Sequence, residues 1–287
     1  MGKRVVFLSQ DSMENHVCDD DLALDAFAAR GLNVETISWR SDAVWSEFDA
    51  VIVRSPWDYM KAPQQFLDTL DRIADSTRLA NSVQVMRWNL DKRYLGELRD
   101  QGVAVVPTEY GESLTEQRLD ELLGEYPEGA VIKPVISAGS MNTFALQPPI
   151  SAATRAKVLN AHANSVYMWQ PFVRSVVEEG EYSLFYFSGQ FSHCIVKRPK
   201  SGDFRVQEEF GGQIVATEAT ADQLQVAESV LAAIPESLLY ARVDLVRGPA
   251  DEWWLIELEI IEPSLYLRCD AMAPERFADA TAAWLDP

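Results

Sequence analysis

The stretch Tyr240–Pro263, YARVDLVRGPADEWWLIELEIIEP, decides the fold of the C-terminal part of this chain. Two runs rich in β-branched and aromatic residues flank the turn-forming letters RGPADE, which predicts a β-hairpin. A turn centred in the middle of those letters sets the register, so that Asp244 faces Glu257 and Arg242 faces Glu259. Side chains alternate between the two faces of a strand, and the acidic ones therefore share one face of the ribbon.

This face of the ribbon predicts a metal site. The carboxylates of Asp244, Glu257 and Glu259 would lie close together beside apolar residues, where like charges raise one another's pKa unless a cation separates them. A hard divalent cation that prefers oxygen ligands, most simply Mg²⁺, would remove this repulsion between the carboxylates. The alternative is a solvated strand face on an acidic protein.

Composition narrows the class of partner. The chain has 287 residues, 47% of them hydrophobic, with a formal charge of −19 and a pI near 4.5. Such a field repels phosphate backbones, so neither a nucleic acid nor an anionic membrane is expected as a partner. No apolar run approaches membrane-spanning length and no signal-peptide pattern begins the chain. Three widely spaced cysteines suit a reducing compartment, which predicts a cytoplasmic protein.

The first 80 residues alternate between strand and helix patterns. Apolar runs at 5–8, 34–39 and 50–53 predict strands, and the spacing of Phe66, Leu67, Leu70 and Ile73 predicts a helix. We therefore expect a small parallel α/β domain over 1–80. Loops that follow such strands face the ligand, which predicts a substrate wall; its members would be Asp11, Arg54, Ser55, Trp57, Asp58 and Tyr59. The alternative is an ordinary loop held by buried aromatic residues.

Two α+β lobes are expected to follow, over 81–173 and 174–287. The first lobe would hold a helix at 90–99, a strand at 103–106 and a strand at 130–134 that ends with Lys133, before a small-residue loop at 137–143. The second lobe would hold a hairpin over 182–197, a helix at 222–233, the acidic ribbon and a last helix at 274–285.

The order of these features resembles the ATP-grasp superfamily, in its glutathione-synthetase-like branch, over nearly the whole chain. The phrases VRSPWDY (53–59) and IELEIIEP (256–263) look most like a subgroup that includes the O-ureido-serine cyclase of cycloserine biosynthesis. One position departs from the common pattern, because most of the superfamily has Asn where Glu259 stands. The resemblance implies a fold in which an α/β domain precedes two α+β lobes that clamp ATP.

The resemblance also implies roles for particular residues. Lys92 and Lys133 would neutralise the ATP phosphates, and a carboxylate would bind the ribose hydroxyls, with Glu178 preferred over Glu181. One or two Mg²⁺ ions, for which Mn²⁺ could substitute, would bind Asp244, Glu257 and Glu259. The remaining groups are a phosphate-covering loop (Gly139, Ser140), an adenine-binding segment (Gln170, Pro171, Phe172, Val173), and cations for the γ-phosphate or the substrate carboxylate (Arg205, Lys197, Arg242).

The implied reaction is carboxylate activation by an ADP-forming ligase. An amino-acid-like small molecule would be converted into an acylphosphate, which a nitrogen nucleophile attacks to form an amide or, within one molecule, a ring. Glutathione-synthetase-like relatives are often dimers or tetramers, so a homo-oligomer is compatible with the resemblance. The alternative is a non-catalytic ATP-binding sensor or scaffold with the same fold. A receiver-like module in the first 80 residues is a further alternative that leaves the rest of the chain unexplained.

Overall fold

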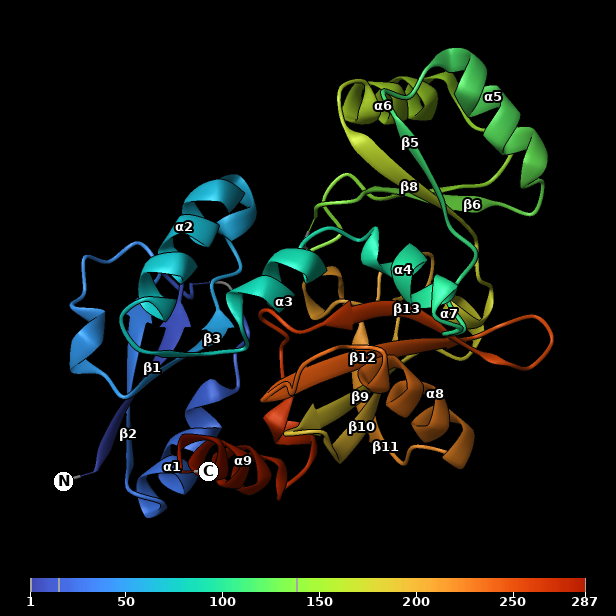
Figure 1. Cartoon of the computed structure of the whole chain (residues 1–287). Helices are drawn as coiled ribbons and strands as arrows, with labels where there is room; N and C mark the ends of the chain where they lie inside the picture. The colour runs from blue at the N-terminus through green and yellow to red at the C-terminus, as the bar shows by residue number, and fades with distance from the viewer. Residues whose placement is uncertain (1, 15, 138, 287) are drawn as a thin grey trace.

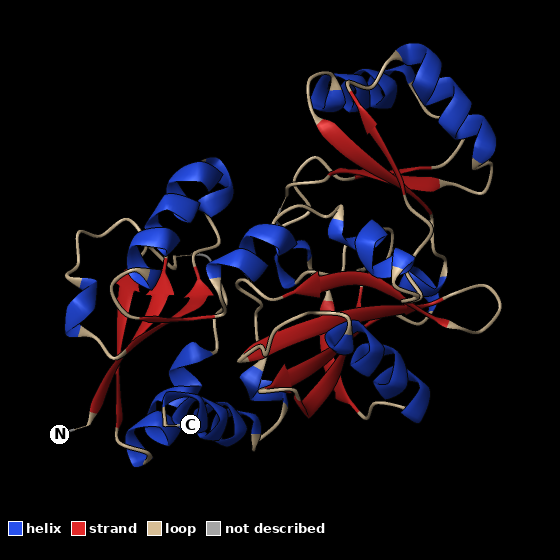
Figure 2. Cartoon of the chain, in the orientation of Figure 1, coloured by secondary structure: helices blue, strands red, loops and turns tan. Residues whose placement is uncertain are grey.

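β-Sheets organise the chain in three separate bodies, as the computed structural model shows for residues 2–14, 16–137 and 139–286 (Figure 1). Figure 2 shows that helices border each sheet, so the protein is a mixed α/β and α+β structure, as expected. A parallel sheet comes first, and two antiparallel sheets follow along the chain.

The N-terminal sheet confirms the predicted parallel α/β arrangement. Its strands are β1 (Lys3–Ser9), β2 (Leu32–Ser38), β3 (Ala50–Ser55) and β4 (Arg78–Ala80), in the order β2-β1-β3-β4. Every residue of β3 is buried, which its continuous apolar run favours in a sheet covered on both faces. Helix α2 (Pro63–Ala74) buries Phe66, Leu67, Leu70 and Ile73 as its periodicity predicts. The other helical segments here are η1 (Asp20–Ala23), α1 (Leu24–Ala29), η2 (Trp45–Glu47) and η3 (Tyr59–Lys61).

The segment that follows β4 corrects two expectations. In place of one helix at 90–99, the chain forms α3 (Val83–Asn89) and α4 (Tyr94–Asp100), with Lys92 in the break between them. The expected strand at 103–106 is a single bridge of Val105 to Leu255, because this stretch lies beside the C-terminal sheet instead of within a sheet of its own lobe.

The middle sheet has the order β5-β8-β6-β7 and all its pairs are antiparallel. Its strands are β5 (Glu109–Glu112), β6 (Ala130–Pro134), β7 (Phe144–Leu146) and β8 (Val166–Pro171). Helices α5 (Glu116–Glu125) and α6 (Ala152–His162) pack on one face, where Leu119, Val158 and Trp169 are fully buried. Lys133 stands at the end of the apolar run of β6, as predicted.

The C-terminal sheet carries the acidic ribbon. Its strands are β9 (Glu181–Phe187), β10 (Gln190–Arg198), β11 (Gln213–Thr217), β12 (Tyr240–Arg247) and β13 (Trp253–Glu259), in the order β11-β10-β9-β12-β13. The β9–β10 hairpin turns through Ser188 and Gly189 at φ of 47° and 74°, a left-handed pair that matches the twist of the strands. The helical segments are α7 (Ser175–Glu178), η4 (Glu208–Phe210), α8 (Ala221–Ala232), η5 (Leu267–Cys269) and α9 (Ala273–Leu285).

Helices from neighbouring regions tie the bodies together. Residues of α3 and α4 share a core with β12 and β13, although the middle sheet follows them in sequence. Helix α9 places Phe277 against Phe7 and Phe187, so the end of the chain packs between the N-terminal and C-terminal sheets (Figure 1). The division into 1–80, 81–173 and 174–287 stays a prediction, with one sheet falling in each range.

Candidate active site

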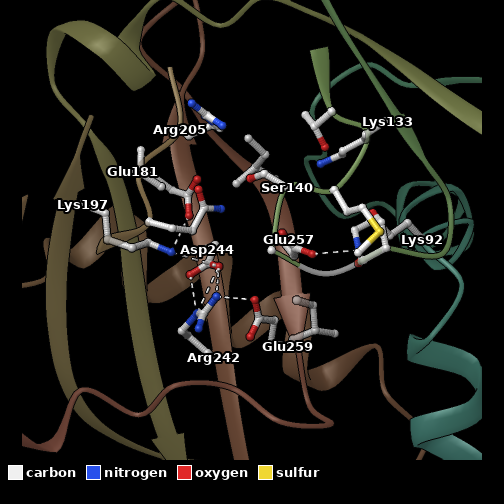
Figure 3. A pocket seen from close by; sticks show the side chains of 18 of the residues that line it. Lys92, Lys133, Ser140, Glu181, Lys197, Arg205, Arg242, Asp244, Glu257 and Glu259 are labelled. Carbon is white, nitrogen blue, oxygen red and sulfur yellow. Dashed lines mark hydrogen bonds and ion pairs between the residues drawn. The ribbon is translucent and has the colours of Figure 1, made fainter. Parts of the chain in front are cut away.

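A cavity of about 500 Å³ lies where the middle sheet faces the C-terminal sheet. Residues from all three predicted regions line it, including the acidic ribbon, the end of β6 and part of the loop after β3. A cavity of this size holds a small-molecule ligand, and its charged lining provides the chemistry (Figure 3).

The acidic ribbon has the register that the sequence predicts. Asp244 is paired with Glu257 and Arg242 with Glu259 across β12 and β13, and a bulge follows only after Asp244. One ligand oxygen from each of Asp244, Glu257 and Glu259 lies within 4.8 Å of the others. The three carboxylates therefore form a compact oxygen-rich cluster on one face of the ribbon.

Asp244 is the most buried member of the cluster and is strongly neutralised. Its Oδ2 lies 2.9 Å from an Arg242 guanidinium nitrogen and 3.4 Å from Lys197 Nζ, and the Ser183 hydroxyl donates to Oδ1. Burial opposes ionisation, but the charges of Arg242 and Lys197 outweigh it and lower the pKa of Asp244 to about 2. The group is therefore a fixed anion at neutral pH.

Glu257 faces the cations of the middle part of the chain. Lys92 Nζ lies 3.1 Å from its Oε1, and Lys92 and Lys133 together outweigh burial and lower the pKa of Glu257. Burial lowers the pKa of Lys133, whose ammonium forms no ion pair within the described residues. In Figure 3 Lys133 and Lys92 lie on the side of the cavity opposite Arg242, so an anion between them would meet positive charge on both sides.

Glu259 behaves differently from the other members of the cluster. Burial and the neighbouring Glu257 raise its pKa to about 7, although Arg242 donates a hydrogen bond to its carboxylate and opposes that shift. The position that the family usually fills with Asn thus carries a carboxyl that an added cation would ionise.

The two candidate ribose ligands lie in different places. Glu178 ends α7 and is exposed outside the cavity, whereas Glu181 lines the cavity and lies 2.6 Å from Lys197 Nζ. Burial raises the pKa of Glu181. Glu178 lies on the exposed side of α7, whereas Glu181 begins β9 on the strand that also carries Ser183, so the structure favours Glu181 for this role.

Other residues expected at the nucleotide line the same cavity. The segment Gln170–Val173 forms one wall at the end of β8, and Gly139 and Ser140 form another, both with left-handed φ of 59° and 58°. Residue 138 of that loop lies outside the described residues. Arg205 also lines the cavity, but Asp203 holds it at 2.6 Å and its guanidinium stacks 3.8 Å above Phe210.

The loop after β3 reaches the cavity through its aromatic residues alone. Trp57 and Tyr59 line the cavity, as expected of a substrate wall. The other four candidates do not line the cavity, and each contacts another residue: Arg54 with Asp20 at 2.9 Å, Ser55 with Ser9 at 2.9 Å, Asp58 with Arg40 at 2.6 Å, and Asp11 with Ser38 and Arg40.

The sequence also missed residues that shape the site. Glu262 lines the cavity after the end of β13, at a position out of step with the alternation of Glu257 and Glu259. Asn89 and Tyr94 line the cavity from α3 and α4. Tyr94 donates to Leu258 O and accepts from Leu258 N, which fixes β13 between Glu257 and Glu259. The third glutamate in IELEIIEP was the available signal, but it falls outside the strict alternation.

The donor set fits Mg²⁺ by its chemistry. Asp244, Glu257 and Glu259 offer only carboxylate oxygens, with no sulfur or imidazole in the cluster. Arg242 and Lys92 already neutralise part of the negative charge of these carboxylates. A further cation would therefore bind together with an anionic ligand that pairs with the lysines.

Comparison with known proteins gives the class of this chain. Residues 105–268 match the model of the prokaryotic glutathione synthetase ATP-grasp domain, and residues 5–81 match that of the D-cycloserine synthetase DcsG N-terminal domain. The chain belongs to the ATP-grasp family and is an ATP-dependent ligase. The resemblance and fold expected from the sequence are thereby confirmed, and the non-catalytic alternative is not favoured.

Two of the similarities concern cycloserine biosynthesis. The chain is 34% identical to "Cycloserine biosynthesis protein DcsG" of Streptomyces lavendulae, over 92% of this chain and 93% of that protein. The crystal structure of D-cycloserine synthetase DcsG superposes with a TM-score of 0.86 at 31% identity, covering 98% of this chain and 99% of that one. D-alanine–D-alanine ligase from Bacillus anthracis shares only the fold, with a TM-score of 0.65 and 13% identity over 99% and 98% of the two chains.

Among the described residues, no helix is both long and apolar enough to cross a membrane.

Proposed function

We propose that this ligase closes a ring within one amino-acid substrate, as in the conversion of an O-ureido-serine-like amino acid to cycloserine. The observation that carries the proposal is the combination of an ATP-grasp site with a DcsG-type N-terminal domain whose Trp57 and Tyr59 close the same cavity. In this arrangement the aromatic residues border the space beyond the phosphate-facing cations, where a small substrate would lie.

The first chemical step is phosphoryl transfer. An oxygen of the substrate carboxylate attacks the γ-phosphorus of ATP, the bond to the β,γ-bridging oxygen breaks, and ADP leaves an acylphosphate behind. Lys92 and Lys133 would bind the phosphates, and Arg242 and Lys197 would lie on the opposite side of the transferred group. Asp244, Glu257 and Glu259 would hold Mg²⁺, which neutralises the charge on the phosphate oxygens.

The second step forms the ring. A nitrogen of the same molecule attacks the acyl carbon, the bond to the phosphate oxygen breaks, and the nitrogen loses a proton as phosphate departs. With an O-ureido substrate the ring nitrogen still carries its carbamoyl group, and water must then cleave that C–N bond, releasing ammonia and carbon dioxide, to give cycloserine. The chain contributes positioning and charge neutralisation and needs no covalent nucleophile. Glu181 would bind the ribose, the backbone at Gln170–Val173 the adenine, and the loop at Gly139 and Ser140 would cover the phosphates.

Three finer expectations belong to the same proposal. Mn²⁺ would substitute for Mg²⁺, because both accept carboxylate oxygens. The enzyme would act in the cytoplasm, where ATP is available and thiols such as those of Cys18, Cys194 and Cys269 stay reduced. It would act on a free small molecule, and a homo-oligomer is compatible with that activity.

A phosphate-release screen tests the function. Mg²⁺-ATP would be combined with amino acids, dipeptides, and ureido or aminooxy amino acids, and products would be identified by mass spectrometry. We expect phosphate release and a cyclic product from the ureido amino acid in the absence of any second amine. Release that requires a second amine would replace ring closure by intermolecular ligation, and nucleotide binding without turnover would favour a sensor.

A further inference from the structure

Glu262 differs from the other acidic residues that line the cavity. Asp244, Glu181, Glu257 and Glu259 each form an ion pair with a lysine or arginine, whereas Glu262 forms none among the residues that the structure describes. The remaining acidic lining residue, Glu209, is exposed to solvent. Glu262 is thus the half-buried carboxyl of this cavity for which the chain supplies no cation.

The backbone around Glu262 is held in one conformation by side chains. After β13 ends, residues 260–263 leave the sheet, and each carbonyl accepts a hydrogen bond from a side chain. The donors are Asn81 to Ile260 O at 2.8 Å, Tyr240 to Ile261 O at 2.9 Å, Trp57 to Glu262 O at 3.0 Å and Arg54 to Pro263 O at 3.0 Å. A carboxyl on such a segment is preorganised to meet a ligand.

Two of these donors come from the N-terminal domain: Arg54 near the end of β3, and Trp57 in the loop that follows it. The Arg54 side chain is 1% exposed, pairs with Asp20, and donates to Pro263 O instead of facing the cavity. The N-terminal domain therefore positions Glu262 through Arg54 and Trp57, in addition to lining the cavity with aromatic rings.

The surroundings of Glu262 favour a cationic ligand group. Burial and the neighbouring Glu259 raise the pKa of Glu262 to about 8, although the Tyr59 hydroxyl and Lys92 favour its charged form. The groups around it are thus Tyr59, Glu259, Glu257 and Lys92, and Lys92 is already paired with Glu257. A second positive charge at this point would restore ordinary ionisation, and the Trp57 ring offers a further contact to an ammonium.

We propose that Glu262 binds the α-ammonium of the amino-acid substrate, between Trp57 and Tyr59. The proposal rests on the proposed function and specifies how that function selects its substrate. A charge-assisted contact to a carboxylate anchors the protonated α-nitrogen and so fixes where the substrate carboxyl and the ureido nitrogen lie relative to the phosphates.

The test compares two substrates on two variants. The substrates are O-ureido-serine and the same molecule with hydrogen in place of its α-amine. For Glu262→Gln we expect KM for the amino compound to rise about tenfold or more. The KM for the deamino compound, the KM for ATP and the Mg²⁺ concentration at half-saturation should stay unchanged within about twofold. The control is Glu218→Gln, which removes an exposed carboxylate outside the cavity and should change none of these constants.

Several outcomes overturn the proposal. Equal KM values of the wild-type enzyme for the amino and deamino compounds would exclude recognition of the ammonium. A Glu262→Gln variant that keeps the wild-type ratio of these two KM values would exclude Glu262 as the residue that recognises it. A shift in Mg²⁺ half-saturation in place of substrate KM would make Glu262 a metal ligand. If Glu262→Gln does not fold, Trp57→Phe serves instead, because it keeps an aromatic ring but removes the donor to Glu262 O. This variant should also raise the KM of the amino compound relative to the KM of the deamino compound.

Failure of the proposed function gives a different pattern. If O-ureido-serine releases no phosphate with the wild-type enzyme, ring closure of that substrate is wrong. The inference is then tested with whichever amino acid the phosphate screen selects and its deamino analogue, and it fails if the Glu262→Gln variant loses no discrimination between them. If the screen selects no compound with an α-amine, Glu262 has no ammonium to bind and the inference fails as well.

Discussion

Lys92 Nζ lies 3.1 Å from Glu257 Oε1, and its second contact, 2.7 Å to Ser137 O, reaches the loop of the middle lobe. The backbone N–H of the same lysine donates to Val135 O at 2.9 Å. Lys92 therefore connects strand β13 to the small-residue loop that follows β6. If Lys92 binds the ATP phosphates, as proposed above, they would compete with Glu257 and Ser137 O for its ammonium.

Replacing Glu257 by Gln should reduce turnover by about a hundredfold or more while the protein stays folded. The change is nearly isosteric and removes only the charge that a metal ion needs. Steady-state phosphate release measures the effect, and thermal unfolding followed by circular dichroism checks the fold. A variant that keeps most of its activity would dismiss Glu257 as a metal ligand, and Glu218→Gln is the matched charge control.

Replacing Lys133 by Met should weaken ATP binding by about ten- to a hundredfold with little loss of stability. Burial lowers the pKa of this lysine and it has no ion pair among the described residues, so its removal leaves no anion without a partner. Calorimetric titration with a non-hydrolysable ATP analogue gives the affinity. An unfolded variant, or a folded one of unchanged affinity, would make the ammonium structural.

Replacing Arg242 by Met should destabilise the ligand-free protein by about 3 kcal/mol. The buried carboxylate of Asp244 would lose its closest cation and keep only Lys197 at 3.4 Å. Urea unfolding measures the free energy of unfolding. The double variant Arg242→Met with Asp244→Asn should recover part of the loss, because the unpaired charge is then gone; absence of recovery would show that the loss comes from packing.

His193 should make the free energy of unfolding depend on pH in the acidic range. Burial lowers its pKa to about 4, while its ring stacks 4.2 Å from Phe185 and contacts Leu265 O at 3.0 Å. In the unfolded chain His193 binds a proton near pH 6.5, whereas in the folded chain it does so only near pH 4. Its contribution to stability is therefore fully present above pH 6.5. It is lost as the pH falls toward 4, by about 3 kcal/mol.

The measurement is urea unfolding between pH 4 and 7.5 on the wild type and on His193→Phe. The variant keeps a ring against Phe185 and should flatten the part of the pH dependence that lies between 4 and 6.5. Identical slopes in the two proteins would assign the acid sensitivity to other groups.

Local pattern was enough to predict much of the C-terminal lobe. The pairing of Asp244 with Glu257 follows from strand alternation and from the centre of one turn, which act over 24 residues of contiguous chain. Helix α2 and the β9–β10 hairpin were predictable for the same reason, since apolar periodicity and turn residues act between near neighbours.

The sequence by itself thus determined the class of fold, the acidic ribbon and the order of the cationic residues along the chain. Tertiary structure decided which groups face the cavity: Glu181 and not Glu178, Trp57 and not Arg54, and the unexpected Glu262. These choices depend on contacts such as that of Arg54 with Pro263, which join residues 209 positions apart. No local periodicity encodes such a contact, because it exists only once the N-terminal domain packs against the segment after β13.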